Sequence, residues 1–329
     1  MVFVSIIIPT HNRTTELLNA LLHLMKQKYK DFEIVIVDDS DEPYKRMNKR
    51  VVGTLSKILT IKYIEVSPTY TSIARNIGIR HSNGDYVAFL DDDDYWLPEK
   101  LLAQVRKIEE GYDFIFTGYV KVNQKGEIMH RYRPQRDVIK NPLKLLSHSN
   151  FIATSSVLVK KKLLEDVGGF DEELPALEDY DCWLQIAKVE EKFAAVKDTL
   201  TVIIQSCSSL SKDNFKQALA LIRFSRKHRP IIGRGKSLSL LIKACQHLKI
   251  MEKDGSNSNA HTVLHKNAIG ILHSIISAKE IGLLMRWKLL INFMLCILPF
   301  GSKYLIKSLW FLNDTLPLIA KRLLSLIVI

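Results

Sequence analysis

The first part of the chain alternates short apolar runs with segments of helical periodicity. The apolar runs are followed by polar residues and are rich in Val and Ile, which predicts buried strands at residues 2–8, 33–37, 58–66 and 85–90. Apolar positions three and four residues apart predict helices at residues 13–27, 71–81 and 97–108. The alternation of strands and helices predicts a parallel sheet that is covered by helices on both faces.

The pattern changes after residue 110. Residues 114–122 and 127–132 flank the turn Asn123-Gln124-Lys125-Gly126 and predict an antiparallel hairpin. Two more strands are expected at 155–159 and 193–204, and a helix at 179–187. From residue 212 only helices are expected, at 213–228, 237–251, 261–278, 281–298 and 303–329. We therefore expect an α/β catalytic domain at 1–211, with halves 1–110 and 111–211, and an all-helical region at 212–329.

Charge divides the chain in the same way. Residues 1–204 hold 28 Lys and Arg against 30 Asp and Glu, whereas residues 205–329 hold 19 against 5. The whole chain of 329 residues carries a net charge of +12, so the entire basic excess lies in the last part. This asymmetry predicts a chemical domain followed by a segment that faces an anionic partner. The four cysteines lack CxxC spacing, which argues against a disulfide scaffold or a structural zinc site.

Two acidic clusters follow predicted strands. Asp38-Asp39-Ser40-Asp41 follows the second strand, and Asp91 to Asp94 follow the fourth. Ligands of open parallel sheets bind beyond the carboxyl ends of the strands, so both clusters are expected at one binding edge. Carboxylates brought together there need a cation, and Mg²⁺ or Mn²⁺ suits oxygen ligands. The alternative is that these aspartates cap helices and form turns, although capping after residue 90 requires at most one of the four.

Four segments, in this order, carry a family resemblance: SIIIPTHNR, EIVIVDDSD, ARNIGIRHSNGDYVAFLDDDDYWLPEKL and VGGFDEELPALEDYDCWLQIA. Over residues 4–204 the chain resembles the family 2 glycosyltransferases of the GT-A fold. The resemblance implies a Rossmann-like, mostly parallel sheet flanked by helices. It also implies an inverting, metal-dependent enzyme that moves one sugar from a nucleotide-diphosphate sugar, with a UDP-sugar expected.

The resemblance assigns roles to individual residues. Asp91 and Asp93 match the acids of the family's DxD motif, with Asp93 the expected direct ligand of Mn²⁺ or Mg²⁺. The nucleotide-sugar side is expected to include Pro9, Thr10, Asp39, Arg75 and Asp92. Among these, Asp39 matches the contact to the base, Asp92 a contact to the ribose and Arg75 a partner of the diphosphate. A surface charge is the alternative reading of Arg75.

The acceptor side carries the expected general base. In the Glu178-Asp179 pair we expect Asp179 to take the proton of the acceptor hydroxyl, while a helix cap is the alternative. Trp183 either lines the acceptor site or lies in the core. The chain departs from the family at Gln185, where Arg is frequent, and near Ser206, where a His that contacts the metal or diphosphate is frequent. The QxxRW signature of processive synthases is absent, which favours the addition of a single sugar.

The basic C-terminal region predicts a surface partner. Its Leu- and Ile-rich helices carry Lys and Arg interleaved with Trp287, Tyr304 and Trp310, a pattern typical of helices in a membrane interface. No charge-free apolar stretch there reaches the length of about 20 residues that spans a bilayer. We expect a peripheral protein on the cytoplasmic face of an anionic membrane, acting on a lipid-linked saccharide or glycolipid in surface-polysaccharide assembly. A helical subdomain packed on the catalytic domain is the alternative, and nucleic-acid binding is disfavoured.

Two other functions remain compatible with an α/β fold. A nucleotidyltransferase would carry a Gly-rich phosphate loop after the first strand, and PTHNR contains no Gly. A non-catalytic nucleotide-sugar-binding module would have no use for an intact Asp93 and Asp179.

Overall fold

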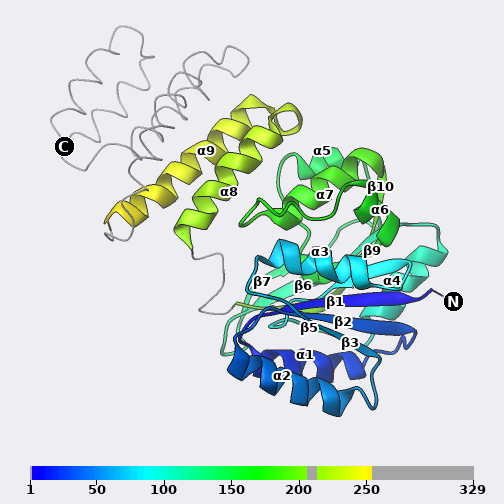
Figure 1. Cartoon of the computed structure of the whole chain (residues 1–329). Coiled ribbons are helices and arrows are strands. Elements are labelled where there is room, and N and C mark those ends of the chain that lie inside the picture. The colour runs from blue at the N-terminus through cyan, green and yellow to red at the C-terminus, as the bar shows by residue number, and fades with distance from the viewer. Residues whose placement is uncertain (1, 206–212, 254–329) are drawn as a thin grey trace, which may run out of the picture. The chain divides into compact units, whose positions relative to one another are not determined.

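The computed structural model describes residues 2–205 and 213–253, and it divides the chain into two compact units, Met1–Leu210 and Ser211–Ile329 (Figure 1). The first unit is built around one ten-stranded sheet. Its strands are β1 (Val4–Thr10), β2 (Phe32–Asp38), β3 (Ile61–Glu65), β4 (Tyr86–Phe89), β5 (Tyr95–Trp96), β6 (Phe114–Val122), β7 (Ile128–Tyr132), β8 (Val138–Lys140), β9 (Val157–Lys160) and β10 (Lys192–Ile204).

The sheet is mixed, with the order β3-β2-β1-β4-β9-β6-β10-β5. Strands β3, β2, β1 and β4 run parallel to one another, and β6 runs parallel to β10. Strand β9 lies between β4 and β6 and runs antiparallel to both. Strands β7 and β8 pair with β6 and β10 beside the main path. The carboxyl ends of β1, β2 and β4 therefore share one edge of the sheet with the beginning of β9.

Helices cover both faces of the sheet (Figure 1). They are α1 (Thr14–Met25), α2 (Glu42–Leu55), α3 (Thr71–His81), α4 (Lys100–Glu109), α5 (Pro142–Leu146), α6 (Lys161–Asp166), α7 (Glu178–Val189) and the short 3₁₀ helix η1 (Thr154–Ser156). On one face, Ile6 and Ile8 of β1 share a buried cluster with Leu21 of α1 and Val52 of α2. On the other, α3 packs against β1 and β2. The period of two along β1 thus sends Ile6 and Ile7 to opposite cores.

Four aromatic rings join α7 to the second face. Trp183 lies 5.2 Å from Phe114, 5.9 Å from Phe170 and 6.2 Å from Phe89 between ring centroids. Its side chain has no exposed surface. Of the two interpretations of Trp183, the structure therefore favours the core, because a ring without exposed surface is not available to line an acceptor site.

Most sequence-predicted elements of the first unit are present within a few residues. The helix at 71–81 matches α3, and the hairpin matches β6 and β7. The sequence pattern missed α2, whose amphipathic stripe is thin: of its 14 residues, only Asn48, Val52 and Leu55 are buried. It also missed the short elements β5, β8, α5 and α6.

The second unit begins with two packed helices, α8 (Asn214–Lys227) and α9 (Arg229–Lys253). The Asp213 side chain caps α8 by accepting bonds from the backbone N–H groups of Phe215 at 3.1 Å and Lys216 at 3.0 Å. Gly233 breaks the regular conformation of α9 with a φ of 74°. No helix in the described residues combines the length and apolarity needed to cross a bilayer. The helices expected at 261–278, 281–298 and 303–329 lie outside the described residues.

Two helical glycines provide a test of the packing between α3 and the sheet. A Cβ at Gly78 would meet Cγ2 of Ile7 at 2.4 Å, whereas a Cβ at Gly53 in α2 would meet nothing within 4 Å. We expect Gly78→Ala to lower the free energy of unfolding by about 1–3 kcal/mol through overpacking. Gly53→Ala is the matched control and should raise it by about 0.5–1 kcal/mol. Urea unfolding monitored by circular dichroism measures both, and equal effects of the two variants would contradict the described contact.

Candidate active site

The polar ends of β1, β2 and β4 are in direct contact at one edge of the sheet. The Thr10 hydroxyl donates to Oδ2 of Asp92 at 2.8 Å, and the backbone N–H of Asp39 donates to the Thr10 carbonyl at 3.1 Å. Pro9 lies in β1 beside Val37 of β2. Four of the residues that the family resemblance assigns to the nucleotide-sugar side, Pro9, Thr10, Asp39 and Asp92, therefore lie at or just beyond the ends of buried strands.

Arg13 holds the centre of the acidic loop. Its Nη1 donates to Oδ2 of Asp93 at 2.8 Å and to Oδ1 of Asp92 at 3.1 Å. Asp92 is 5% exposed, and burial raises its pKa to about 7 in spite of Arg13, with Asp93 adding to the rise. Burial and the neighbouring Asp91 also raise the pKa of Asp93. The carboxylates are thus short of positive charge, and a cation would relieve them.

Asp94 anchors the same loop to the rest of the sheet. Its Oδ2 accepts from the Ser155 hydroxyl at 2.6 Å, and its Oδ1 accepts from the backbone N–H of Ile204 at 3.1 Å. The Ser155 hydroxyl oxygen also accepts from the backbone N–H of Asp91 at 3.2 Å. Burial, together with Asp91 and Asp93, raises the pKa of Asp94 well above its ordinary value. Asp94 points away from solvent, so its role is to fix the loop.

Arg75 links the acidic loop to α7. Its Nη2 donates to Oδ1 of Asp91 and its Nη1 to Oε1 of Glu178, both at 2.7 Å. Its guanidinium also lies 5.3 Å above the ring of Phe170. Arg75 is only 3% exposed, and although burial opposes its charge, Asp91 and Glu178 hold its pKa above the ordinary value. Arg75 is therefore a buried bridge between two carboxylates and not a surface charge.

Asp39 is held from two sides. Its Oδ1 lies 3.1 Å from Nδ1 of His11, and its Oδ2 accepts from the backbone N–H of Thr69 at 2.9 Å. The preceding Asp38 is fully buried and accepts from Nδ2 of Asn48 at 2.7 Å and from the Tyr63 hydroxyl. Asp38 therefore secures the turn that presents Asp39 beyond the end of β2.

Asp179 lies in the first turn of α7, next to Glu178. Its Oδ2 accepts from the Thr154 hydroxyl at 3.2 Å and from Nδ2 of Asn150 at 3.3 Å. Burial, followed by the charge of Glu178, raises the pKa of Asp179 to about 6, and Arg75 opposes this rise. A carboxylate with a pKa close to neutrality is suited to accept a proton.

The acidic loop offers oxygen ligands for a divalent cation. Within residues 2–205 and 213–253, no three His, Cys, Asp or Glu side chains form a ready-made metal site. The side chains of Asp91 and Asp93 are 35% and 19% exposed, so both can reach a ligand. Mg²⁺ at nucleotide sites is usually held by one or two carboxylates and completed by phosphate oxygens and water. Two partly exposed carboxylates that lie two residues apart fit that chemistry.

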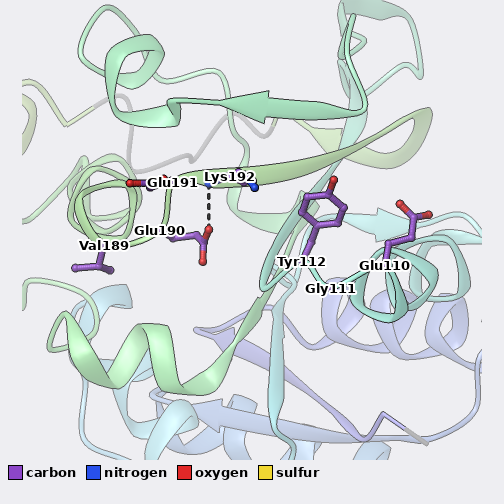
Figure 2. A pocket seen from close by; sticks show the side chains of 7 residues that line it. All are labelled: Glu110, Gly111, Tyr112, Val189, Glu190, Glu191 and Lys192. Atoms are coloured by element: carbon purple, nitrogen blue, oxygen red, sulfur yellow. Dashed lines mark hydrogen bonds between the residues drawn. The ribbon is translucent and has the colours of Figure 1, made fainter.

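A surface pocket of about 420 Å³ lies elsewhere (Figure 2). It is lined by residues just before β6 and around the start of β10, namely Glu110, Gly111, Tyr112, Val189, Glu190, Glu191 and Lys192. The Glu190 side chain accepts from the backbone N–H of Lys192 at 3.0 Å. This pocket is at the amino ends of the parallel strands, the edge opposite the acidic loop, and contains no residue of the candidate site.

Sequence reasoning missed several members of the site. Arg13, Asn150, Thr154 and Ser155 each bond to an acidic side chain there. Arg13 lies in the PTHNR segment, close enough to a strand end to be found from position alone. Thr154 and Ser155 precede a short strand, and nothing in their spacing indicates contact with Asp179, 25 positions away, or with Asp94, 61 positions away. Gln185 accepts from Lys188 on the same helix, and Ser206 lies outside the described residues.

Comparison with known proteins finds glycosyltransferases in each case. Residues 5–168 match the family described as Glycosyl transferase family 2. An uncharacterized glycosyltransferase of Rickettsia conorii is 30% identical over 192 residues, covering 56% of this chain and 31% of that protein. The chain thus spans about a third of the length of that relative. The amylovoran biosynthesis glycosyltransferase AmsB of Erwinia amylovora is 30% identical over 205 residues, covering 60% of this chain and 67% of that protein.

Solved structures show the same fold. S. aureus TarS (1–349) in complex with UDP-GlcNAc matches with a TM-score of 0.63 and 16% identity, covering 83% of this chain and 81% of that one. The mannosyltransferase PcManGT from Pyrobaculum calidifontis, in complex with GDP-Man and Mn²⁺, matches with a TM-score of 0.53 and 18% identity, covering 89% and 85%. The mixed sheet with helices on both faces is the GT-A fold that the sequence motifs implied. Together with the family match, this places the chain in glycosyl transferase family 2.

Proposed function

We propose that this protein is an inverting glycosyltransferase that moves a single sugar from a UDP-sugar to a hydroxyl of a lipid-linked saccharide or glycolipid. The observation that carries the proposal is the Arg75 bridge, which joins Asp91 of the acidic loop to Glu178, the neighbour of Asp179. Donor-side and acceptor-side carboxylates are thereby held in one site. The UDP-GlcNAc bound to TarS supports a uridine nucleotide, and the residue for the base contact is Asp39.

On the donor side, Asp91 and Asp93 would hold Mn²⁺ or Mg²⁺, and Asp92 would contact the ribose. A divalent cation at this position supplies positive charge that stabilises a departing nucleoside diphosphate. Arg13 donates to Asp93, so it offsets part of the negative charge of the acidic loop. Thr10 fixes the orientation of Asp92 through its hydroxyl.

On the acceptor side, Asp179 would act as the general base. The acceptor oxygen forms a bond to C1 of the sugar as its proton passes to a carboxylate oxygen of Asp179. The bond from C1 to the diphosphate oxygen breaks on the opposite side, so the configuration at C1 inverts. A positioned base contributes roughly 10²–10⁴-fold to such a reaction.

The metal assignment predicts the behaviour of Asp93→Ala. We expect the affinity for UDP in the presence of Mn²⁺ to fall by about tenfold or more, because one of two carboxylate ligands is lost. Isothermal titration calorimetry with and without Mn²⁺ measures this, and thermal unfolding confirms that the variant is folded. The matched control is Asp85→Ala, which removes an exposed carboxylate just before the start of the same strand. Unchanged Mn²⁺-dependent binding by Asp93→Ala would exclude Asp93 as a ligand.

The base assignment predicts a separation of binding from turnover. Asp179→Asn should lower kcat by about 10²-fold or more and leave UDP affinity nearly unchanged, because only proton acceptance is lost. Since Asp179 must be deprotonated and its pKa is raised to about 6, wild-type kcat at saturating donor should decline as the pH falls below about 6. If Asp179→Asn keeps its turnover and Glu178→Gln does not, the role belongs to Glu178.

The second unit supports a peripheral membrane location on the cytoplasmic face. Residues 213–253 contain 10 Lys and Arg but only 2 Asp and Glu. On α8, Leu221 and Phe224 are buried, whereas Arg223, Arg226 and Lys227 are exposed. The apolar face of α8 is buried within its unit, and the exposed basic residues are attracted to anionic lipid by about 1 kcal/mol for each residue near the surface.

Flotation of the full chain with liposomes tests this location. We expect flotation with vesicles that contain phosphatidylglycerol, none with pure phosphatidylcholine, and release at high salt. Salt shortens the Debye length from about 10 Å at 0.1 M to about 3 Å at 1 M. Arg223→Glu with Arg226→Glu should weaken flotation, while the matched pair Arg46→Glu with Arg50→Glu on exposed positions of α2 should not. Absence of flotation in every condition would favour a helical subdomain with no membrane role.

A further inference from the structure

Three consecutive residues with hydroxyl side chains form η1, and each hydroxyl donates to a different partner. The Thr154 hydroxyl donates to Oδ2 of Asp179, the Ser155 hydroxyl donates to Oδ2 of Asp94, and the Ser156 hydroxyl donates to the backbone carbonyl of Ala153. We propose that η1 is a positioning element for both halves of the reaction: Ser155 sets the acidic loop, and Thr154 orients Asp179. The inference rests on the proposed function of Asp179 as the base.

Ser155 acts on the loop through two bonds at once. Its hydroxyl donates at 2.6 Å to Asp94 and accepts at 3.2 Å from the backbone N–H of Asp91. Asp94 in turn accepts from the backbone of Ile204 at the end of β10. The backbone of Asp91 and the side chain of Asp94 are the two ends of the segment that carries Asp93. Ser155 therefore ties both ends to one atom and limits where the carboxylate of Asp93 can lie.

Thr154 acts on Asp179 through the hydrogen bond that its hydroxyl donates. The groups that face Asp179 are Glu178 on its own helix, Arg75 from α3, Tyr119 from β6, Asn150 and Thr154. Glu178 disfavours the charged form of Asp179, and Arg75 favours it. The Thr154 hydroxyl donates to the same oxygen as Asn150, so it both favours the carboxylate form and restricts its rotation.

The backbone of η1 is held firmly enough for this role. The Trp96 indole N–H donates to the Ser155 carbonyl at 2.7 Å, and Nε2 of Gln104 donates to the Ser156 carbonyl at 3.0 Å. Thr154, Ser155 and Ser156 are 8%, 1% and 0% exposed. Buried carbonyls with fixed donors leave the turn little freedom, so the direction of each hydroxyl is set by the backbone.

The arrangement makes Ser156 an internal control. Ser156 is as buried as its neighbours, but its hydroxyl bonds only within the turn, to the Ala153 carbonyl. A general loss of packing in η1 would affect all three alanine or valine variants alike. A positioning role instead predicts a different measurement for each residue.

The experiment compares Thr154→Val, Thr154→Ser, Ser155→Ala and Ser156→Ala in the full chain. Each is measured for the affinity of UDP with Mn²⁺ by calorimetry, for the pH profile of kcat at saturating donor, and for thermal unfolding. We expect Thr154→Val to move the acid limb of the profile up by about half a pH unit or more at unchanged UDP affinity. Thr154→Ser, which keeps the hydroxyl, should leave the acid limb of the pH profile at its wild-type position. Ser155→Ala should weaken Mn²⁺-dependent UDP binding by about fivefold or more without moving the limb, and Ser156→Ala should change neither.

Asp94→Asn provides a second test of the Ser155 contact if Ser155→Ala does not fold. The single side-chain oxygen of Asn cannot accept from both the Ser155 hydroxyl and the backbone N–H of Ile204, so one of these bonds is lost and Mn²⁺-dependent UDP affinity should fall by about fivefold or more.

Several results would overturn the proposal. Identical pH profiles for Thr154→Val and Ser156→Ala exclude the role of Thr154, and wild-type UDP affinity in Ser155→Ala excludes that of Ser155. Wild-type UDP affinity in Asp94→Asn excludes a loop that is held through Asp94 and the Ser155 hydroxyl. If Asp179→Asn keeps the wild-type kcat, Asp179 is not the base and the role of Thr154 falls with it. If Asp179→Asn loses its activity but the pH profile of Thr154→Val is unshifted, only the inference about η1 is rejected.

Discussion

Four successive carboxylates at the end of one buried strand repel one another, and much of the site consists of groups that offset this repulsion. Arg13 approaches from the end of β1 and bonds to Asp92 and Asp93, and Arg75 approaches from α3 and bonds to Asp91. Asp94 is turned inward and satisfied by a hydroxyl and a backbone N–H. What remains is a deficit of positive charge at Asp91 and Asp93, the two more exposed members, and a divalent cation would offset it.

The same repulsion couples the two halves of the site. Arg75 is shared between the acidic loop and the first turn of α7, so the field that it exerts on Asp179 depends on how fully the loop is neutralised. Any change of charge at the loop therefore alters the electrostatic potential at Asp179, the proposed base, even if no atom near Asp179 moves. Electrostatic coupling of this kind is strong here because Arg75 is almost completely shielded from water.

The sequence pattern predicted the strands and most helices of the first unit because buried strands are nearly continuous apolar runs and carry the acidic loops at their ends. It missed α2, whose apolar stripe is thin, and it left Trp183 undecided between core and acceptor site, since a ring in an amphipathic helix is compatible with both. Arg75, Thr154 and Ser155 escaped a definite assignment for another reason. Their partners lie in the first turn of α7 and in the loop after β4, and local periodicity contains no information on contacts between segments so far apart in the sequence.

The reversed direction of β9 has a consequence for the segment that precedes it. The chain leaves the edge of the acidic loop at the end of β6 and returns to the same edge at η1, so residues 123–153 form an excursion with both ends at the candidate site. Its strands β7 and β8 pair beside the main path of the sheet, so a change of length around them leaves the register of β1, β2 and β4 intact. The end of the excursion is more constrained, because α5 packs on α7 and Asn150 bonds to Asp179.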